Sequence, residues 1–130
     1  MKVIVHYPFA EEEIEELRKA VLAHGDHKIV HVAAAEEAVA EAADTEVLLG
    51  HFGPAVVTAA GKLRWIQSFS AGMDSALFPE IIDSDVEVSN AAGLHAPQGA
   101  EHAWAMVLAL ARQLFEGLDS QRQHLWGGTT

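Results

Sequence analysis

Short apolar runs alternate with longer segments that carry an apolar residue every three or four positions along the first 90 residues. The apolar runs predict strands buried on both faces of a parallel sheet, at residues 2–6, 28–32, 47–50, 63–68 and 86–89. The segments between them predict helices over residues 11–25, 35–43 and 54–60. This alternation predicts an α/β domain over residues 1–96, a flavodoxin-like open parallel sheet with helices on both faces.

A different pattern follows in residues 97–115, where the middle has no polar face. Every residue from Ala103 to Ala111 is apolar, and a helix that is apolar all round must be covered on several sides. The stretch is too short for lipid, because a membrane span needs roughly 20 apolar residues. We therefore expect a long apolar interdomain helix at residues 97–115, within connecting helices over residues 97–130. This helix should make a homodimer contact through Trp104, Val107, Leu108 and Ala111.

Charge and cysteine content narrow the classes of function. The 8 basic and 19 acidic residues give a net charge of -11, which repels nucleic acid and anionic membranes. The chain has no cysteine, so disulfides and thiolate metal sites are excluded and a cytoplasmic location is favoured. His24, His27 and His31 straddle a predicted turn and strand, so we predict no metal site.

The predicted sheet selects the loops where a ligand would bind. In open parallel sheets, ligands bind outside the carboxyl ends of the strands, which here are residues 7–9, 51–53, 69–74 and 90–96. Ser70, Ala71 and Gly72 follow a buried strand, where backbone N–H groups can bind a carboxylate or phosphate. The alternative is a plain tight turn that needs Gly72 for its backbone conformation.

Aromatic residues fall on two of these loops. Tyr7, Phe9 and Phe52 could form an apolar wall for a substrate side chain, or they could cap the core of the domain. A third interpretation is nucleophilic, since the spacing of Ser68, Ser70 and Gly72 is similar to the G-x-S-x-G elbow of hydrolases. It is the weakest, because the first glycine is replaced and no acid and histidine follow in the expected order.

Three separated motifs carry a resemblance to a known family. They are LRWIQSFSAGMDSALFP from Leu63, VSNAAGLHAPQGAEHAWAMVLALARQL from Val88, and QRQHLW from Gln121. In this order they resemble the D-isomer-specific 2-hydroxyacid dehydrogenases. The resemblance implies a flavodoxin-like substrate-binding domain followed by a Rossmann domain that binds NAD or NADP, and hydride transfer between a small 2-oxo acid and a D-2-hydroxy acid.

The resemblance also implies roles for individual residues. The backbone amides of Ala71 and Gly72, with Ser70 beside them, would bind the substrate carboxylate. Tyr7, His51 and Phe52 would face the substrate side chain. The segment from Asn90 to Pro97 would be the first crossing between the two domains.

One departure from the family pattern limits what this chain can do. The dinucleotide fingerprint G-x-G-x-x-G is absent, since Gly93 and Gly99 have the wrong spacing and the Gly127–Gly128 pair is followed only by two threonines. We therefore expect a substrate-domain fragment with no catalytic residue of its own and no bound cofactor. Two alternatives remain open at this stage, a freestanding small-carboxylate binding or regulatory module without catalysis and a Ser70 hydrolase.

Overall fold

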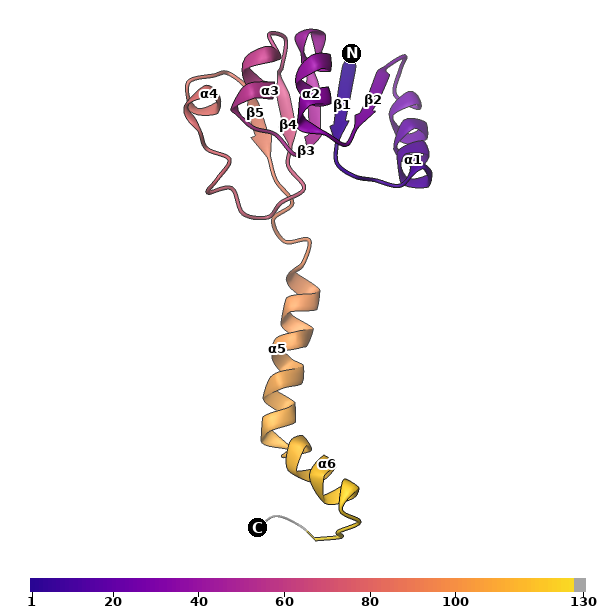
Figure 1. The fold of residues 1–130 in the computed structure, drawn as a ribbon, viewed down its shortest axis with the longest axis vertical. Helices are drawn as coiled ribbons and strands as arrows, with labels where there is room; N and C mark the ends of the chain where they lie inside the picture. The colour runs from indigo at the N-terminus through magenta and orange to yellow at the C-terminus, as the bar shows by residue number, and fades with distance from the viewer. Residues whose placement is uncertain (128–130) are drawn as a thin grey trace. The chain divides into compact units, whose positions relative to one another are not determined.

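The computed structural model describes residues 1–127, which fall into two compact units. Unit 1 runs from Met1 to Ala92, and unit 2 begins at Gly93. The strands of unit 1 are β1 (Lys2–His6), β2 (Lys28–Val32), β3 (Val47–Gly50), β4 (Trp65–Gln67) and β5 (Glu87–Ser89). Its helices are α1 (Glu11–Leu22), α2 (Ala35–Glu41), the 3-10 helix η1 (Ala42–Asp44), α3 (Pro54–Ala59) and α4 (Pro79–Ile82) (Figure 1).

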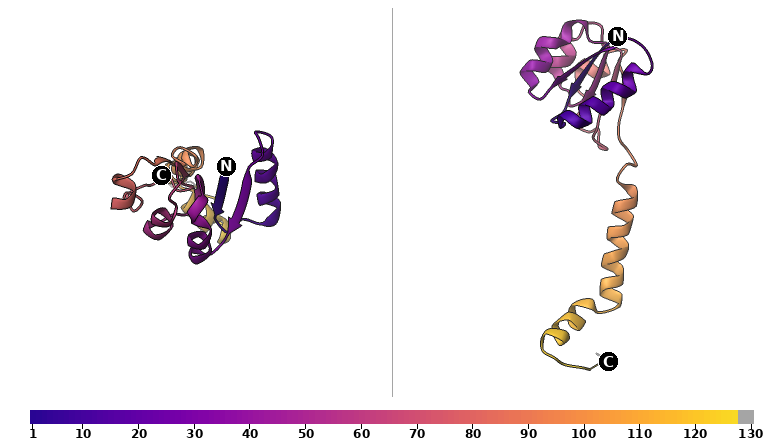
Figure 2. Two further views of the ribbon diagram at one scale, coloured as in Figure 1. Left: turned by 90° about the horizontal axis from the view of Figure 1, so that it is seen from above. Right: turned by 90° about the vertical axis from the view of Figure 1, so that its right-hand side faces the viewer.

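The strands form one parallel sheet in the order β2-β1-β3-β4-β5. This is the flavodoxin-like order, in which the chain reverses direction across the sheet between β1 and β3. The predicted fold class is therefore confirmed. All of β1 is buried, as expected for a strand covered on both faces, and α1 lies on the opposite side of the sheet from α2 and α3 (Figure 2).

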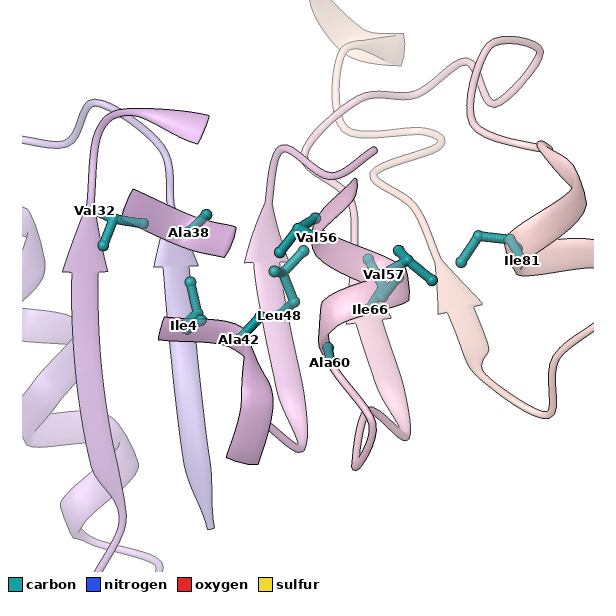
Figure 3. Packing of buried hydrophobic residues seen from close by; sticks show 10 residues of the cluster. All are labelled: Ile4, Val32, Ala38, Ala42, Leu48, Val56, Val57, Ala60, Ile66 and Ile81. Carbon is teal, nitrogen blue, oxygen red and sulfur yellow. The ribbon is translucent and has the colours of Figure 1, made fainter. Parts of the chain in front are cut away.

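The main core lies between one face of the sheet and helices α2, α3 and α4. Ile4, Leu48 and Ile66 come from three neighbouring strands and are completely buried. Val32, at the end of β2, extends this layer of the sheet. Opposite the sheet lie small or branched side chains from the helices and from the residue after α3: Ala38, Ala42, Val56, Val57, Ala60 and Ile81 (Figure 3). Each fully buried aliphatic side chain stabilises the fold by about 1.5–3 kcal/mol, so this layer fixes the register of the sheet.

Lys2 links the amino end of the sheet to α2 and η1 through side-chain hydrogen bonds. Its ammonium group donates to the Glu41 carbonyl at 2.6 Å, the Glu41 carboxylate at 2.9 Å and the Asp44 carboxylate at 2.7 Å. Hydrogen bonds to Asp44 and Glu41 raise the pKa of Lys2 above its ordinary value. The Lys2 ammonium in turn lowers the pKa of both carboxyl groups.

Several element boundaries differ from the sequence-based expectation. The predicted strand at residues 63–68 is only Trp65–Gln67, and α4 was not predicted at all.

Residues 97–115 do not form one helix. Helix α5 (Ala96–Ala111) ends at Arg112, Gln113 adopts a left-handed conformation with φ of 50°, and a separate helix α6 (Leu114–Arg122) begins. No glycine or proline marks the break, which falls at the polar residues Arg112 and Gln113.

Unit 2 is helical and, taken by itself, leaves its apolar side chains uncovered. None of the residues of α5 is buried within it, and Trp104 and Leu110 are 65% and 71% exposed. Among the described residues, no helix has both the length and the apolar character that crossing a membrane requires. The Gly127–Gly128 pair noted in the sequence extends beyond the described residues.

Candidate functional site

The loop after β4 is held by its carbonyl groups. Ser70 donates its backbone N–H to the Ser68 hydroxyl at 3.1 Å, and its carbonyl accepts the Ala91 N–H at 3.1 Å. The Ala71 carbonyl accepts the Asn90 side-chain amide at 2.8 Å. The loop is therefore fastened to the segment that follows β5, although the two lie about 20 residues apart in the sequence.

The backbone N–H groups of this loop are arranged differently. Within residues 1–127, no protein group accepts a hydrogen bond from the N–H groups of Ala71 and Gly72. Gly72 is not among the glycines with a positive φ, and a Cβ built on it would meet nothing within 4 Å. The tight-turn alternative therefore does not account for Gly72. A loop with tied carbonyls, unpaired N–H groups and open space beside them can bind an anion.

Polar side chains of β4 and β5 support the start of this loop. Trp65 donates its indole N–H to the Ser89 hydroxyl at 2.8 Å, and that hydroxyl donates to the Gln67 side-chain carbonyl at 2.7 Å. The Gln67 amide then donates to the Ser68 carbonyl at 2.8 Å. This chain of hydrogen bonds holds the residue from which the loop departs.

The ends of β1 and β3 meet closely at the point where the strand order reverses. His51 donates its backbone N–H to the His6 carbonyl at 2.8 Å, and the His6 imidazole donates from Nδ1 to the His51 carbonyl at 2.9 Å. Gly50 permits this approach: its φ is 102°, and a Cβ there would lie 2.4 Å from the His6 carbonyl oxygen. The two loops that leave these strands are therefore fixed side by side.

His31, at the fourth position of β2, holds the β1 loop from the other side. Its imidazole donates from Nε2 to the Tyr7 carbonyl at 2.9 Å. Neither His6 nor His31 was identified from the sequence as a site residue. Each lies inside an apolar run, and only the pairing of β1 with β2 and β3 brings them to these carbonyls.

Four rings from three loops gather at this edge, and we call them the ring cluster: Tyr7, Phe9, His51 and Phe69. The Tyr7 ring lies 4.7 Å from Phe9, 5.1 Å from His51 and 5.3 Å from Phe69, centroid to centroid, and Phe9 lies 5.5 Å from Phe69. Such spacings are typical of favourable aromatic pairs. Phe69 was missed by the sequence analysis, although it follows β4 directly in a loop that the sheet had selected.

Phe52 does not join the ring cluster. Its ring lies 6.1 Å from Phe78, and both rings pack against the main core. Phe52 is adjacent to His51 in the chain, yet the two rings have different neighbours, Phe78 for Phe52 and Tyr7 for His51. From the sequence, Tyr7, Phe9 and Phe52 could form a wall for a substrate side chain or cap the core. The structure divides the set, with Phe52 on the core and the other two in the ring cluster.

Two other kinds of site find no support in the described part of the chain. No histidine hydrogen-bonds to the Ser70 hydroxyl, and that hydroxyl lacks the base that a serine nucleophile requires. No group of three or more histidine, aspartate or glutamate side chains within residues 1–127 could hold a metal ion.

Comparisons with known proteins bear on the family and the fold of the chain. The sequence model of the D-isomer specific 2-hydroxyacid dehydrogenase catalytic domain matches residues 3–130. No curated protein sequence matches the chain directly. Among solved structures, a D-isomer specific 2-hydroxyacid dehydrogenase family protein from Aeromonas salmonicida superposes with a TM-score of 0.74 at 25% identity, over 99% of this chain and 41% of that one.

Two further structures share the fold at lower identity. An NAD-dependent formate dehydrogenase from Staphylococcus aureus, in complex with NAD, matches with a TM-score of 0.66 at 22% identity, over 98% of this chain and 43% of its own. An NAD+-bound 3-phosphoglycerate dehydrogenase from Entamoeba histolytica matches with a TM-score of 0.64 at 21% identity, over 84% and 38%. The chain thus spans about two fifths of the length of these proteins. Because the family's sequence model covers nearly its whole length, the chain belongs to the D-isomer specific 2-hydroxyacid dehydrogenase family.

Proposed function

We propose that this chain supplies the substrate-binding part of an NAD(P)-dependent D-2-hydroxyacid dehydrogenase, an enzyme that interconverts a small 2-oxo acid and its D-2-hydroxy acid. The observation that carries the proposal is the loop of Ser70, Ala71 and Gly72. Its carbonyls are tied to Asn90 and Ala91, and its N–H groups at Ala71 and Gly72 are unpaired. The carboxylate common to both forms of the substrate binds to these N–H groups.

The neighbouring loops face the remainder of the substrate in this proposal. Tyr7 and His51 stand at the switch point of the sheet, beside the carboxylate loop, and Phe69 links the two groups through its contact with Tyr7. Phe52 contributes through the shape of its loop, because its ring is directed to the core. The carboxylate is thereby held at one end and the substrate side chain lies against rings at the other.

The described residues do not fit a nicotinamide cofactor. No strand follows α5 within residues 1–127, and the sequence contains no G-x-G-x-x-G turn between a strand and a helix. We therefore assign no step of hydride or proton transfer to any residue of this chain. Two of the similar structures hold NAD, and we propose that in the intact enzyme the reduced cofactor would donate a hydride to the 2-oxo acid and the oxidised cofactor would accept it from the D-2-hydroxy acid.

A homodimer is the third part of the proposal. We assign residues 1–96 to the substrate-binding domain and residues 97–130 to connecting helices, and we expect the apolar surface of α5 to be covered by a second copy. Trp104, Val107 and Leu108 are each more than half exposed in unit 2. Sedimentation of the wild-type chain and of a Trp104→Ser variant tests this: the wild type should sediment as a dimer and the variant at a lower average mass. A strictly monomeric wild type would refute it.

Carboxylate binding is tested by NMR titration of the ¹⁵N-labelled chain with D-lactate and pyruvate. Saturable shifts of the Ala71 and Gly72 amides are expected, and uncharged lactamide should not produce them. An Asn90→Ala variant removes the side chain that fastens Ala71, so its dissociation constant should rise about fivefold, the equivalent of one hydrogen bond of about 1 kcal/mol. Unchanged Ala71 and Gly72 amides at tens of millimolar ligand would contradict the proposed function.

A further inference from the structure

The loops around the proposed carboxylate site differ sharply in charge from the rest of unit 1. Residues 7–10, 51–53, 68–78 and 90–92 form the carboxyl edge of the sheet and contain no lysine or arginine. Asp74 supplies their only formal charge within the described chain, and it is exposed. A second anionic group on a bound substrate would therefore find no cation here and would be repelled by Asp74.

The cations of unit 1 lie elsewhere. Lys2 and Lys28 begin β1 and β2, while Lys62 and Arg64 precede β4, so all four are at the amino edge of the sheet. Arg18 is on α1, where it pairs with Glu11 and Glu15, and Lys19 follows it. Because β1 to β4 are parallel, their whole length separates the amino-edge cations from the carboxylate loop.

The ring cluster provides the opposite kind of surface. Tyr7, Phe9 and Phe69 are each half-buried, so their rings are fixed by mutual contact yet still reach the surface. His51 is exposed, and its ring is tilted by 31° relative to the Tyr7 ring. A surface of ring faces and edges binds apolar and aromatic groups, both by excluding water and by offset or edge-to-face contact.

From these observations we infer that the substrate carries an apolar side chain, preferably aromatic, and not a phosphate or a second carboxylate. This inference rests on the proposed function, in which the substrate carboxylate binds at Ala71 and Gly72. It separates the chain from relatives such as the 3-phosphoglycerate dehydrogenase, whose named substrate bears a phosphate. The side chain of the substrate lies against Tyr7 and Phe69 while its carboxylate occupies the neighbouring N–H groups.

Four ligands that share the 2-hydroxy acid group and differ in side chain test the inference at constant ionic strength. They are D-lactate, D-3-phenyllactate, D-malate and D-3-phosphoglycerate, each titrated into the ¹⁵N-labelled full chain. D-3-phenyllactate should bind at least about fivefold more tightly than D-lactate, since aromatic contact alone contributes about 1 kcal/mol. It should also shift the Tyr7 and Phe69 ring protons, and D-malate and D-3-phosphoglycerate, which each carry a second anionic group, should bind more weakly than D-lactate.

Two variants distinguish the contribution of the ring cluster to ligand preference from the contribution of the rest of the loop after β4. Phe69→Leu should reduce the preference for D-3-phenyllactate over D-lactate, measured as the ratio of the two dissociation constants, to less than about twofold. Leu77→Ala is the matched control, since Leu77 is in the same loop, 57% exposed and outside the ring cluster, and it should keep the full preference. A native amide spectrum for each variant establishes that it folds.

The possible failures are distinguishable. If all four ligands shift Ala71 and Gly72 but D-malate or D-3-phosphoglycerate binds as tightly as D-3-phenyllactate, the inference about the side chain is wrong and the proposed function stands. The same conclusion follows if D-3-phenyllactate leaves the Tyr7 and Phe69 rings unshifted. If none of the four shifts the two amides, the proposed function and the inference fall together.

Discussion

Gly50 is the last residue of β3, at the point where β3 comes closest to β1. Replacement of Gly50 by alanine measures how much this close approach contributes to the stability of the fold. A Cβ at this position would lie 2.4 Å from the His6 carbonyl oxygen and 3.2 Å from the Tyr7 Cβ. The φ of 102° is also one that L-residues with a side chain rarely adopt. The contact with the His6 backbone cannot be relieved by a side-chain rotation, so the strands themselves must separate.

The cost of Gly50→Ala can be summed from the structure. A non-glycine residue in the left-handed region costs about 1–2 kcal/mol. Separation of the strand ends weakens the two hydrogen bonds between His6 and His51, each contributing about 1 kcal/mol. The free energy of unfolding should therefore fall by about 2–4 kcal/mol, which lowers the urea midpoint by about 1–2 M.

Urea unfolding followed by far-ultraviolet circular dichroism measures this loss, with Gly53→Ala as the matched control. Gly53 is in the same loop, its φ of -160° suits alanine, and a Cβ there would meet nothing within 4 Å. The control should change stability by less than about 0.5 kcal/mol. A loss below about 1 kcal/mol for Gly50→Ala would refute the close-approach argument, and so would equal losses for the two variants.

Two further predictions concern other hydrogen bonds of unit 1. In His31→Gln, the glutamine amide can still donate a hydrogen bond to the Tyr7 carbonyl from a position close to that of Nε2, so the dissociation constant of the ligand should stay within about twofold of wild type. His31→Leu loses this hydrogen bond and should weaken ligand binding by about fivefold. Equal effects of the two variants would show that the imidazole acts only by packing. Lys2 stabilises the fold in a pH window set by its partners. The pKa values of Glu41 and Asp44 are lowered in the folded state, so their stabilisation is present above the ordinary values of 4.5 and 3.8 and is lost as the pH falls through the lowered folded values. The pKa of Lys2 is raised, so its contribution is complete below 10.5 and is lost as the pH rises through the higher folded value. Unfolding midpoints of Lys2→Met measured from pH 2 to pH 11 should lie below wild type at neutral pH, converge with it as the pH falls to 2, and begin to approach it as the pH rises above 10.5. A constant difference across the whole range would show that the loss is not electrostatic.

The strands were largely predictable from sequence, for a reason visible in β1. A strand covered on both faces must be apolar at successive positions, and Val3, Ile4 and Val5 are all buried. Short elements were less predictable. Helix α4 is four residues long, Pro79–Ile82, too short to show a helical period, and only packing of Ile81 on the core reveals it. The break after α5 was hidden because Gln113 carries no sequence signal for a left-handed residue.

The sequence was enough to propose which loops form the candidate site, but not which side chains support those loops. The rule that ligands bind at the carboxyl ends of parallel strands located the loops, and the small residues after β4 indicated an anion site. The partners of these loops were not predictable, because His6, His31 and Asn90 act on carbonyls that lie 19 or more residues away along the chain. The division of Phe52 from Tyr7 depends on which rings lie beside each of them in the fold.

By itself, the sequence determined the parallel α/β architecture and the membership of the family, because strand periodicity and local motifs are written in consecutive residues. The tertiary structure decided which side chains support the site. Strand pairing brings the ends of β1, β2 and β3 together, and only then do a hydrogen bond from His31, the absent Cβ of Gly50 and the contact of Phe69 with Tyr7 exist. These are relations between distant segments, which no local pattern encodes.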